Sequence, residues 1–482
     1  MNYILSIDQG TTSTTAFLYD RNGQIVARSS KEFSQKYPKP GWVEHDANEI
    51  WQTVVDTVTD VCAPTAGSIA AVGITNQRET TVVWDRTTGE PVCNAIVWQC
   101  RRTADLCNAL KDHEALITEK TGLPLDAYFS GTKLRYILDH TPNRANLVFG
   151  TIDTWLIYKL TGGAVHATDY TNASRTMLCN ISTMAWDDEL CALLGVPRDM
   201  LPEIRKSSDD YGEVTAIEAI RGVPVCGVAG DQQAALFGQN CTAPGQIKNT
   251  YGTGCFAVLN TGSAYIRSRQ GLLSTLAADS SGNPCYALEG SIFIAGAAVQ
   301  WLRDELGIIR HASETEEMAR ATDDNAGVYL VPAFVGLGAP HWDMDARGTL
   351  VGLTRGVNRN HLARAVLESM AYQSLDVIRA MEGETGSRVN ELAVDGGAAA
   401  NSWLMQFQAD ILGIPVRRPA VVESTSLGAA FLAGLKFGFW SGPAEITALK
   451  KNDTVFNPAM SDERRRDALA GWQKALRQAR TK

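Results

Sequence analysis

The sequence predicts an α/β protein with two large domains that flank a catalytic cleft. Short apolar strand patterns alternate with helical patterns, as at residues 69–74, 81–84 and 50–62. A chain of 482 residues is too long for one compact core. A strand, a Gly-Thr turn and a second strand occur at the N-terminus and again at residues 248–259. We therefore expect one domain at residues 1–247 and another at residues 248–482, each beginning with a β-hairpin.

The composition excludes several classes of protein. Hydrophobic residues make up 45% and charged residues 20% of the chain, without a run of about 18 apolar residues that could cross a bilayer. The N-terminus lacks the basic segment of a secretion signal, so we expect a cytoplasmic protein with reduced cysteines. A net charge of -9 argues against general nucleic-acid binding, so a bound polyphosphate must rely on local N–H groups and a cation.

The first element is an apolar strand, Tyr3 to Ile7, that leads through Asp8 into a turn at residues 10–13. Exposed N–H groups and hydroxyls of such a turn can bind phosphate oxygens, while Asp8 stays free to hold a hydrated cation. A plain hairpin explains this segment alone equally well. Next comes a helix at residues 50–62, whose start is predicted by a capping box from Asp46 to Glu49.

Large polar residues then interrupt the strand pattern at residues 76–79, where a simple turn would not require them. Arg78 and Glu79 are either a solvated surface pair or a cleft pair, in which the guanidinium donates to substrate hydroxyls and the carboxylate accepts from them. Trp98 and Phe256 lie in apolar strand patterns, so a core role is the default interpretation for both.

Two further acidic residues follow apolar strands. Asp231 separates the strand pattern of residues 223–228 from a short helix, so an N-cap is its plain interpretation, although a capping Asp can still be catalytic. Asp395 precedes two glycines and a helical pattern that contains Leu404, Phe407 and Ile411, which puts small residues at a helix N-terminus. Together with the turn after Asp8, these elements suggest a nucleotide clamp. The charged, amphipathic segment 461–482 predicts a terminal surface helix.

Over its whole length the chain resembles the FGGY carbohydrate kinase family of the actin-like ATPase superfamily. The characteristic blocks are long, which makes them more specific than a single glycine motif. They stand at residues 7–13, 38–45, 73–80, 98–102, 128–133 and 249–256, and the two family signatures stand at residues 129–140 and 352–368. The resemblance implies two ribonuclease H-like domains, a homo-oligomer and ATP-dependent phosphorylation of glycerol to sn-glycerol 3-phosphate.

The same resemblance implies roles for single residues. Asp231 would be the catalytic base, and with Asp8 it would hold Mg²⁺. The expected glycerol-binding residues are Arg78, Glu79, Trp98, Tyr128, Asp231, Gln232 and Phe256. The expected ATP-binding residues are Thr11, Thr12, Ser13, Thr253, Gly296, Gln300, Gly397 and Asn401.

One departure stands in the phosphate hairpin, where Thr15 replaces the family's usual arginine. Losing a charge-assisted bond there would weaken nucleotide binding by about 1.5–3 kcal/mol unless another cation replaces it. Two alternatives remain beside a kinase for glycerol. The first is a kinase for another polyol or sugar, and the second is a non-catalytic, nucleotide-dependent sensor.

Overall fold

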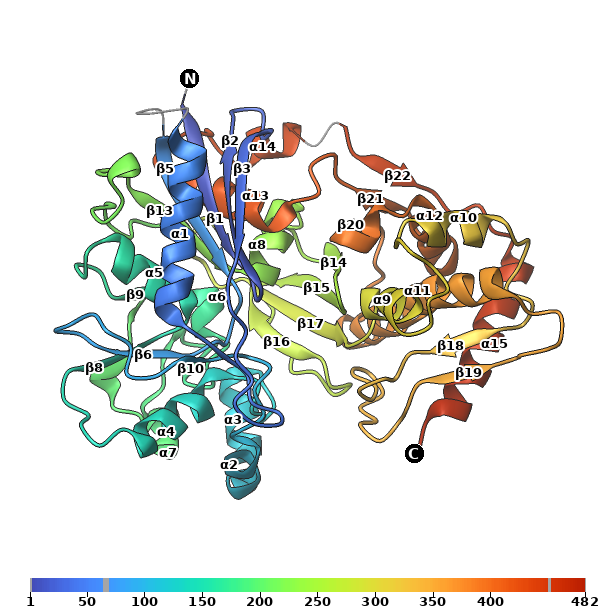
Figure 1. The fold of residues 1–482 in the computed structure, drawn as a ribbon, viewed down its shortest axis with the longest axis horizontal. Helices are drawn as coiled ribbons and strands as arrows, with labels where there is room; N and C mark the ends of the chain where they lie inside the picture. Colours follow the sequence, from blue (N-terminus) through green and yellow to red (C-terminus); the bar gives the residue numbers. More distant parts are fainter. Residues whose placement is uncertain (1, 64–68, 450–451, 482) are drawn as a thin grey trace.

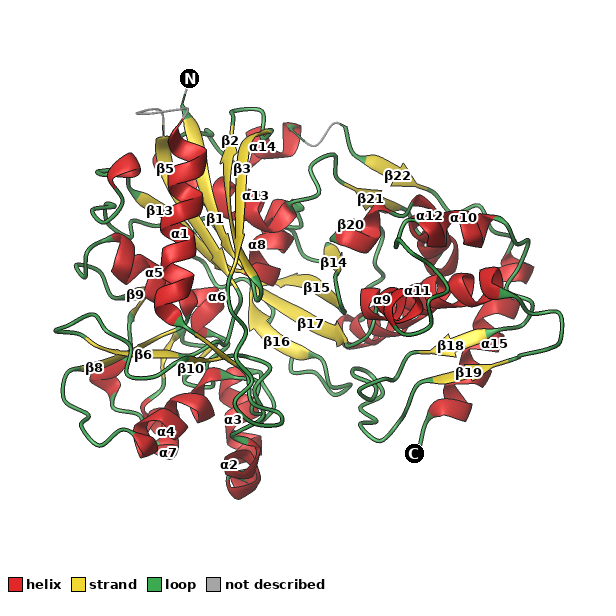
Figure 2. Cartoon of the chain, viewed as in Figure 1, coloured by secondary structure: helices red, strands yellow, loops and turns green. Residues whose placement is uncertain are grey.

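The computed structural model describes residues 2–63, 69–449 and 452–481, which form two halves that each contain a mixed β-sheet (Figure 1). The first sheet has the order β13-β5-β1-β2-β3, and the second has the order β16-β17-β15-β14-β20-β21-β22. In each sheet the first strand along the chain pairs antiparallel with the second, and two later strands run parallel to the first on its other side. Helices cover these sheets (Figure 2), which confirms the predicted α/β class.

The elements up to residue 238 form most of the first half. Its strands are β1 (Tyr3–Gln9), β2 (Ser13–Tyr19), β3 (Ile25–Glu32), β4 (Glu44–His45), β5 (Ile69–Asn76), β6 (Val82–Asp85), β7 (Ala95–Ile96), β8 (Leu147–Gly150), β9 (Ala167–Asp169), β10 (Cys179–Asn180), β11 (Ala185–Trp186), β12 (Glu203–Arg205) and β13 (Val225–Gly230). Its α-helices are α1 (Ala47–Cys62), α2 (Ala104–Ala109), α3 (Glu114–Thr121), α4 (Ser130–His140), α5 (Ile152–Leu160), α6 (Tyr170–Ala173), α7 (Asp188–Leu194) and α8 (Asp231–Gly238).

The later elements begin with the second predicted hairpin. The strands are β14 (Ile247–Tyr251), β15 (Cys255–Gly262), β16 (Leu273–Leu276), β17 (Tyr286–Ile292), β18 (Tyr329–Val331), β19 (Thr349–Val351), β20 (Leu392–Asp395), β21 (Val416–Arg418) and β22 (Thr454–Phe456). The helices are α9 (Gly296–Asp304), α10 (Glu314–Arg320), α11 (Arg359–Thr385), α12 (Ser402–Leu412), α13 (Ser424–Phe437), α14 (Pro443–Ala448) and α15 (Asp462–Ala479).

The two faces of the first sheet are covered by helices from distant parts of the chain. Apolar residues of α1 pack on one face, and those of α13 pack on the other. Helix α13 approaches so closely that a Cβ on Gly73 would lie 2.3 Å from the Ala429 carbonyl oxygen. Residues 424–437 therefore return to the first sheet, although they follow residue 247 in the sequence. The division of the chain at residue 247 stays a prediction.

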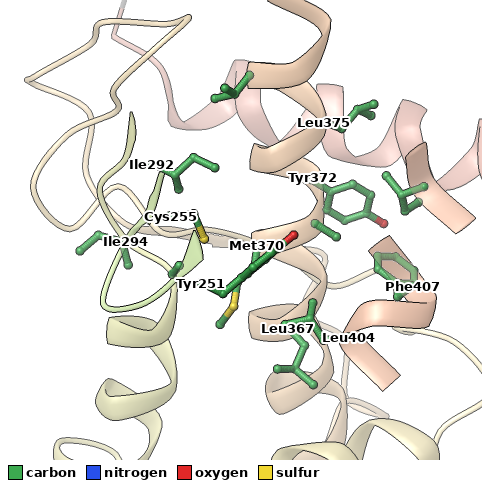
Figure 3. Packing of buried hydrophobic residues seen from close by; sticks show 14 of the residues in the cluster. Tyr251, Cys255, Ile292, Ile294, Leu367, Met370, Tyr372, Leu375, Leu404 and Phe407 are labelled. Carbon is green, nitrogen blue, oxygen red and sulfur yellow. The ribbon is translucent and has the colours of Figure 1, made fainter. Parts of the chain in front are cut away.

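The second half has its own hydrophobic core around the 27-residue helix α11. Figure 3 shows Met370 and Tyr372 of this helix between side chains of the second sheet, such as Tyr251, and side chains of α12, such as Phe407. The buried Tyr251 hydroxyl donates to Gln408 Oε1 at 2.5 Å. Because the hairpin strand β14 is packed and hydrogen-bonded in this way, the turn that follows Tyr251 has a rigid base.

Helix α1 begins as predicted, but its capping box is incomplete. The Asp46 carboxylate accepts bonds from the Asn48 and Glu49 N–H groups. Glu49 does not complete the box, because its carboxylate binds the N–H and hydroxyl of Ser34 instead. No helix among the described residues is both long and apolar enough to cross a membrane.

Candidate functional site

Two Gly-Thr turns lie at the ends of corresponding hairpins in the two halves. In the first, the Gly10 N–H donates to the Ser13 carbonyl at 2.9 Å, and Thr12 is exposed. In the second, the Gly252 N–H donates to the Gly254 carbonyl at 2.8 Å, and Thr253 is exposed. Both turns therefore leave a threonine available to a ligand, as a phosphate-binding hairpin requires.

Asp8 and Asp231 lie close enough to interact electrostatically. Asp8 is in β1, and Asp231 is the first residue of α8, directly after β13. Burial, together with the negative charges of Asp231 and Glu423, raises the pKa of Asp8 to about 7, and Arg28 opposes the change. Two neighbouring carboxylates form a suitable environment for a divalent cation, which would relieve their repulsion.

The surroundings of these carboxylates fit Mg²⁺ better than a metal held entirely by protein. Among the described residues, no group of three or more His, Cys, Asp and Glu side chains could hold a metal ion. Mg²⁺ commonly takes one or two carboxylates and fills its other positions with water and substrate phosphates. The hydroxyl of Thr75 is also buried without a partner, on the β5 residue that pairs with Asp8.

Arg78 and Glu79 are buried at the junction of the two halves, which excludes the alternative of a solvated surface pair. The Arg78 guanidinium binds Glu289 of β17 through two hydrogen bonds, of 2.6 and 3.2 Å. Its Nε also lies 3.1 Å from Asp231 Oδ1. Arg78 thus connects the proposed base on α8 to a strand of the second sheet.

Arg175 and Glu289 complete this charged network, although neither was predicted from the sequence. Arg175 Nε donates to Glu79 at 2.6 Å, and its Nη2 donates to Glu289 at 3.1 Å. Burial alone would raise the pKa of Glu289, but Arg175 and Arg78 lower it to about 2. The one available signal for Glu289 is that it alone is charged in the mostly buried strand of residues 286–292.

The aromatic residues of the predicted acceptor site lie beside these charges. The rings of Trp98 and Tyr128 meet edge to face at 5.5 Å, and the Arg175 guanidinium lies 5.8 Å from the Tyr128 ring. Trp98 is only partly buried, and its indole N–H donates to the Thr11 hydroxyl at 3.0 Å. Trp98 therefore lies beside the first phosphate hairpin, and its partial exposure argues against a pure core role.

The remaining two predicted glycerol-binding residues come from different halves. Gln232 is the second residue of α8, whereas Phe256 is in β15. Lys248 of β14 donates both to the Gln232 side chain and to the Phe256 carbonyl. The structure therefore connects these two residues through one shared donor.

The predicted ATP-binding residues of the second half lie on elements joined to its hairpin. The Gly296 N–H, at the start of α9, donates to the Gly252 carbonyl at 3.0 Å, and a Cβ on Gly296 would lie 2.6 Å from that oxygen. Asn401 caps α12 by accepting from the Leu404 N–H. Gln300 and Gly397 are exposed, so both are accessible to a ligand.

The hairpin position without an arginine has a local polar partner instead. The Thr15 hydroxyl shares a 2.9 Å hydrogen bond with the Ser30 hydroxyl. The cation whose charge acts on Asp8 is Arg28 of β3, and it pairs with Glu423 at 3.3 Å. The structure thus places an arginine near this hairpin, on the strand next to that of Thr15.

Sequence comparison matches both halves of the chain to one family. The N-terminal domain of the FGGY family of carbohydrate kinases matches residues 3–238, and its C-terminal domain matches residues 247–437. The glycerol kinase of Desulfitobacterium hafniense is 57% identical over 489 residues, covering 99% of both chains. Glycerol kinase 2 of Thermotoga maritima is 55% identical over 492 residues, covering 99% of this chain and 98% of that protein.

Solved structures agree with this family and with the predicted fold class. The chain is similar to Plasmodium falciparum glycerol kinase with ADP at a TM-score of 0.94 and 37% identity, with 99% of this chain and 98% of that one covered. It shares its fold with Lactobacillus acidophilus xylulose kinase at a TM-score of 0.88 and 24% identity, with 99% and 97% covered. The two-domain α/β arrangement is therefore confirmed.

Proposed function

Because the chain belongs to the FGGY family of carbohydrate kinases, we propose that it transfers the γ-phosphoryl group of ATP to a terminal hydroxyl of glycerol. The product is sn-glycerol 3-phosphate. The observation that carries this conclusion is the full-length identity of 55–57% to curated glycerol kinases. The buried charged and aromatic groups beside Asp231 support it, because a nucleotide-dependent sensor has no need of a polar pocket next to that residue.

Asp231 is the proposed general base. It accepts the proton of the glycerol hydroxyl as that oxygen attacks the γ-phosphorus, and Arg78, 3.1 Å away, holds the carboxylate in place. Arg78 and Glu79 orient the acceptor hydroxyls as donor and acceptor, together with Tyr128 and Gln232. Trp98 and Phe256 provide apolar walls for the carbon backbone.

The nucleotide is proposed to lie between the two hairpins. Thr11, Thr12 and Ser13 bind its phosphates from the first half, and Thr253 binds them from the second. Gly296, Gln300, Gly397 and Asn401 complete the ATP site. Asp8 and Asp231 hold Mg²⁺, which offsets the phosphate charge when it is bound.

The active protein is proposed to be a cytoplasmic homo-oligomer, a dimer or tetramer. Light scattering of the purified protein at working concentration measures the assembly. A monomer would contradict that part of the proposal without affecting the reaction.

The test of the reaction is ADP release from Mg-ATP with glycerol, xylulose, erythritol, gluconate or no acceptor. We expect release with glycerol, and we expect it to be lost in Asp231→Asn. Turnover with a different acceptor would retain the mechanism but contradict the assigned substrate. Absence of turnover with every acceptor would favour the sensor alternative.

A further inference from the structure

Lys248 is a buried cation at the junction of the two halves that the proposed reaction leaves without a role. It lies in β14 and is fully buried. The strand register pairs it with Val258 of β15 and Ala393 of β20, both of which belong to an apolar cluster with Leu236 of α8. Lys248 therefore lies on the face of the second sheet that packs toward the helix carrying Asp231.

Three acceptors from both halves satisfy the Lys248 ammonium. Its Nζ donates to Gln232 Oε1, to Thr250 Oγ1 at 2.8 Å and to the Phe256 carbonyl at 3.2 Å. An ammonium group has three N–H donors, so these bonds use all of them. Lys248 thus connects one acceptor-site residue on α8 to another in the second sheet.

The charges around Lys248 have both signs. Burial lowers the pKa of Lys248, the carboxylates of Asp395, Asp231 and Glu289 oppose that change, and Arg78 adds to it. Burying a cation away from water is costly unless nearby carboxylates and a full set of hydrogen bonds compensate for the lost hydration. The three acceptors meet that requirement, so the position of the ammonium is well determined.

This geometry fixes which end of the Gln232 amide faces away from the lysine. An ammonium group cannot accept a hydrogen bond, so it must face the amide oxygen. The Gln232 amide nitrogen has no hydrogen-bond acceptor among the described residues. It is also not among the fully buried polar atoms of those residues that lack a partner, so it is exposed to solvent. The –NH2 group is therefore the accessible end of this side chain.

We propose that Lys248 is a positioning residue for the acceptor pocket, which holds the Gln232 amide so that its –NH2 group donates to an oxygen of a glycerol hydroxyl. This inference rests on the proposed function. It adds that one glycerol hydroxyl accepts a hydrogen bond from the pocket. A residue from the other half of the molecule orients the donor of that bond. The bond to the Phe256 carbonyl fixes the apolar wall relative to the same group.

The test is a double-mutant cycle on glycerol affinity in the full-length protein. Lys248→Met should raise the glycerol Kd roughly tenfold, the equivalent of one well-placed hydrogen bond, while the ADP Kd changes less than about twofold. Gln232→Ala should cause a similar loss, and the double variant should show no further loss. Losses that multiply, or an unchanged glycerol Kd in Lys248→Met, would overturn the proposal.

A diol panel provides a readout that a merely structural role would not change. 1,3-Propanediol lacks the central hydroxyl of glycerol, and 1,2-propanediol lacks a terminal one. Whichever diol lacks the hydroxyl that Gln232 binds should bind the wild type more weakly than glycerol does. In Lys248→Met that difference should shrink, because the amide is no longer held. An equal difference in both proteins would contradict the proposed role.

Two further variants keep the inference testable. If Lys248→Met does not fold, Gln232→Glu retains an acceptor for Lys248 but has no –NH2 group, so it should show the same loss of glycerol affinity. Wild-type affinity in Gln232→Glu would overturn the inference. Lys120→Met is the matched control, because Lys120 binds Asp187 and Glu189 outside the site. Failure of the wild type itself to bind or phosphorylate glycerol would instead disprove the proposed function.

Discussion

Glu79 combines a strained backbone with a charged side chain at the proposed glycerol site. Its φ is 61°, in the left-handed region that costs a residue other than glycine about 1–3 kcal/mol. The Ser130 and Thr81 hydroxyls donate to its carbonyl, and Arg175 binds its carboxylate. Surrounding bonds therefore maintain a conformation that the isolated segment would avoid, and they aim Glu79 toward Arg78 and the proposed substrate.

Asp231→Asn should lower turnover by roughly 10²- to 10⁴-fold, the usual contribution of a general base. The amide is almost isosteric with the carboxylate and can still accept from Arg78, so glycerol affinity should change much less than turnover. ADP release at saturating glycerol and Mg-ATP measures the effect, and the thermal midpoint confirms that the variant is folded. Unchanged turnover would refute the role of Asp231.

Glu289→Gln should destabilise the protein, because it leaves the buried charges of Arg78 and Arg175 without their shared carboxylate. Breaking a buried ion pair in this way typically costs about 3–5 kcal/mol. Urea unfolding at pH 7 measures the change. The control is Glu445→Gln, whose partner Arg21 is largely exposed, and this variant should unfold near the wild-type midpoint. Equal midpoints for both variants would contradict the importance of the network.

At the scale of elements, helices α8 and α13 cross with almost no space between their backbones. A Cβ on Gly428 would lie 1.9 Å from the Ala234 carbonyl oxygen, and one on Gly238 would lie 2.0 Å from the Ser424 carbonyl oxygen. Helix α8 begins with Asp231. The position of Asp231 therefore depends on the close contact between α8 and α13 that Gly238 and Gly428 allow.

Gly428→Ala should force these two helices apart. We expect a loss of stability of about 1–3 kcal/mol or more, the cost of overpacking, and a lower turnover because Asp231 moves with α8. Chemical unfolding and ADP release measure the two effects. Gly442→Ala is the control, since its Cβ would meet nothing within 4 Å and its φ of 165° is extended. Equal behaviour of the two variants would contradict the tight crossing.

Helix α4 contains a buried lysine whose titration should appear in the stability of the protein. Lys133 donates to the carbonyls of Tyr128 and Phe129, which precede the helix. Burial lowers the pKa of Lys133 to about 7 from its ordinary 10.5, although nearby Glu79 opposes the change. Between these two values the unfolded chain holds more protons, so this group makes the unfolding free energy rise with pH.

Wild type should therefore gain stability relative to Lys133→Met as the pH rises from 7 toward 10. A single group contributes at most about 1.4 kcal/mol per pH unit. Urea unfolding at several pH values measures the difference between the two proteins. Below pH 7 the difference should be constant, and parallel curves across the whole range would contradict a lowered pKa.

Local elements were predictable where their signals lie within a few residues. Alternating apolar residues and Gly-Thr turns predicted both hairpins, and the structure forms them as β1–β2 and β14–β15. The cap at Asp46 was also predictable, whereas the behaviour of Glu49 was not, because its partner Ser34 is outside the helix. Periodicity could predict α13 as a helix, but not that it packs against the first sheet.

The charged site was only partly predictable for a related reason. Arg78 and Glu79 attracted attention because large polar residues interrupted a strand pattern. Arg175 and Lys248 carry no local sign of their roles. Arg175 is 96 residues from Glu79 in the sequence. Lys248 of strand β14 is 16 residues from Gln232 of helix α8. Partners of this kind emerge only when folding brings the two halves together.

At the scale of the whole molecule, the proposed chemistry lies where the two halves meet. The first half supplies Asp231 and Arg78, and the second supplies Glu289 and Lys248. Their contacts form one polar junction between the two halves. Movement of one half relative to the other would alter the acceptor site and the nucleotide site together, which would couple glycerol binding to phosphoryl transfer and limit transfer to water.

The most direct test of the central claim is a competition among acceptors in one reaction. Glycerol, xylulose and gluconate at equal concentration are incubated with limiting Mg-ATP, and the products are identified by ³¹P NMR with proton coupling. We predict glycerol 3-phosphate as the dominant product signal, identified by its chemical shift against authentic standards, because a phosphate on the terminal CH2 group of xylulose or gluconate gives the same triplet. A dominant xylulose or gluconate phosphate, or inorganic phosphate alone, would contradict the account.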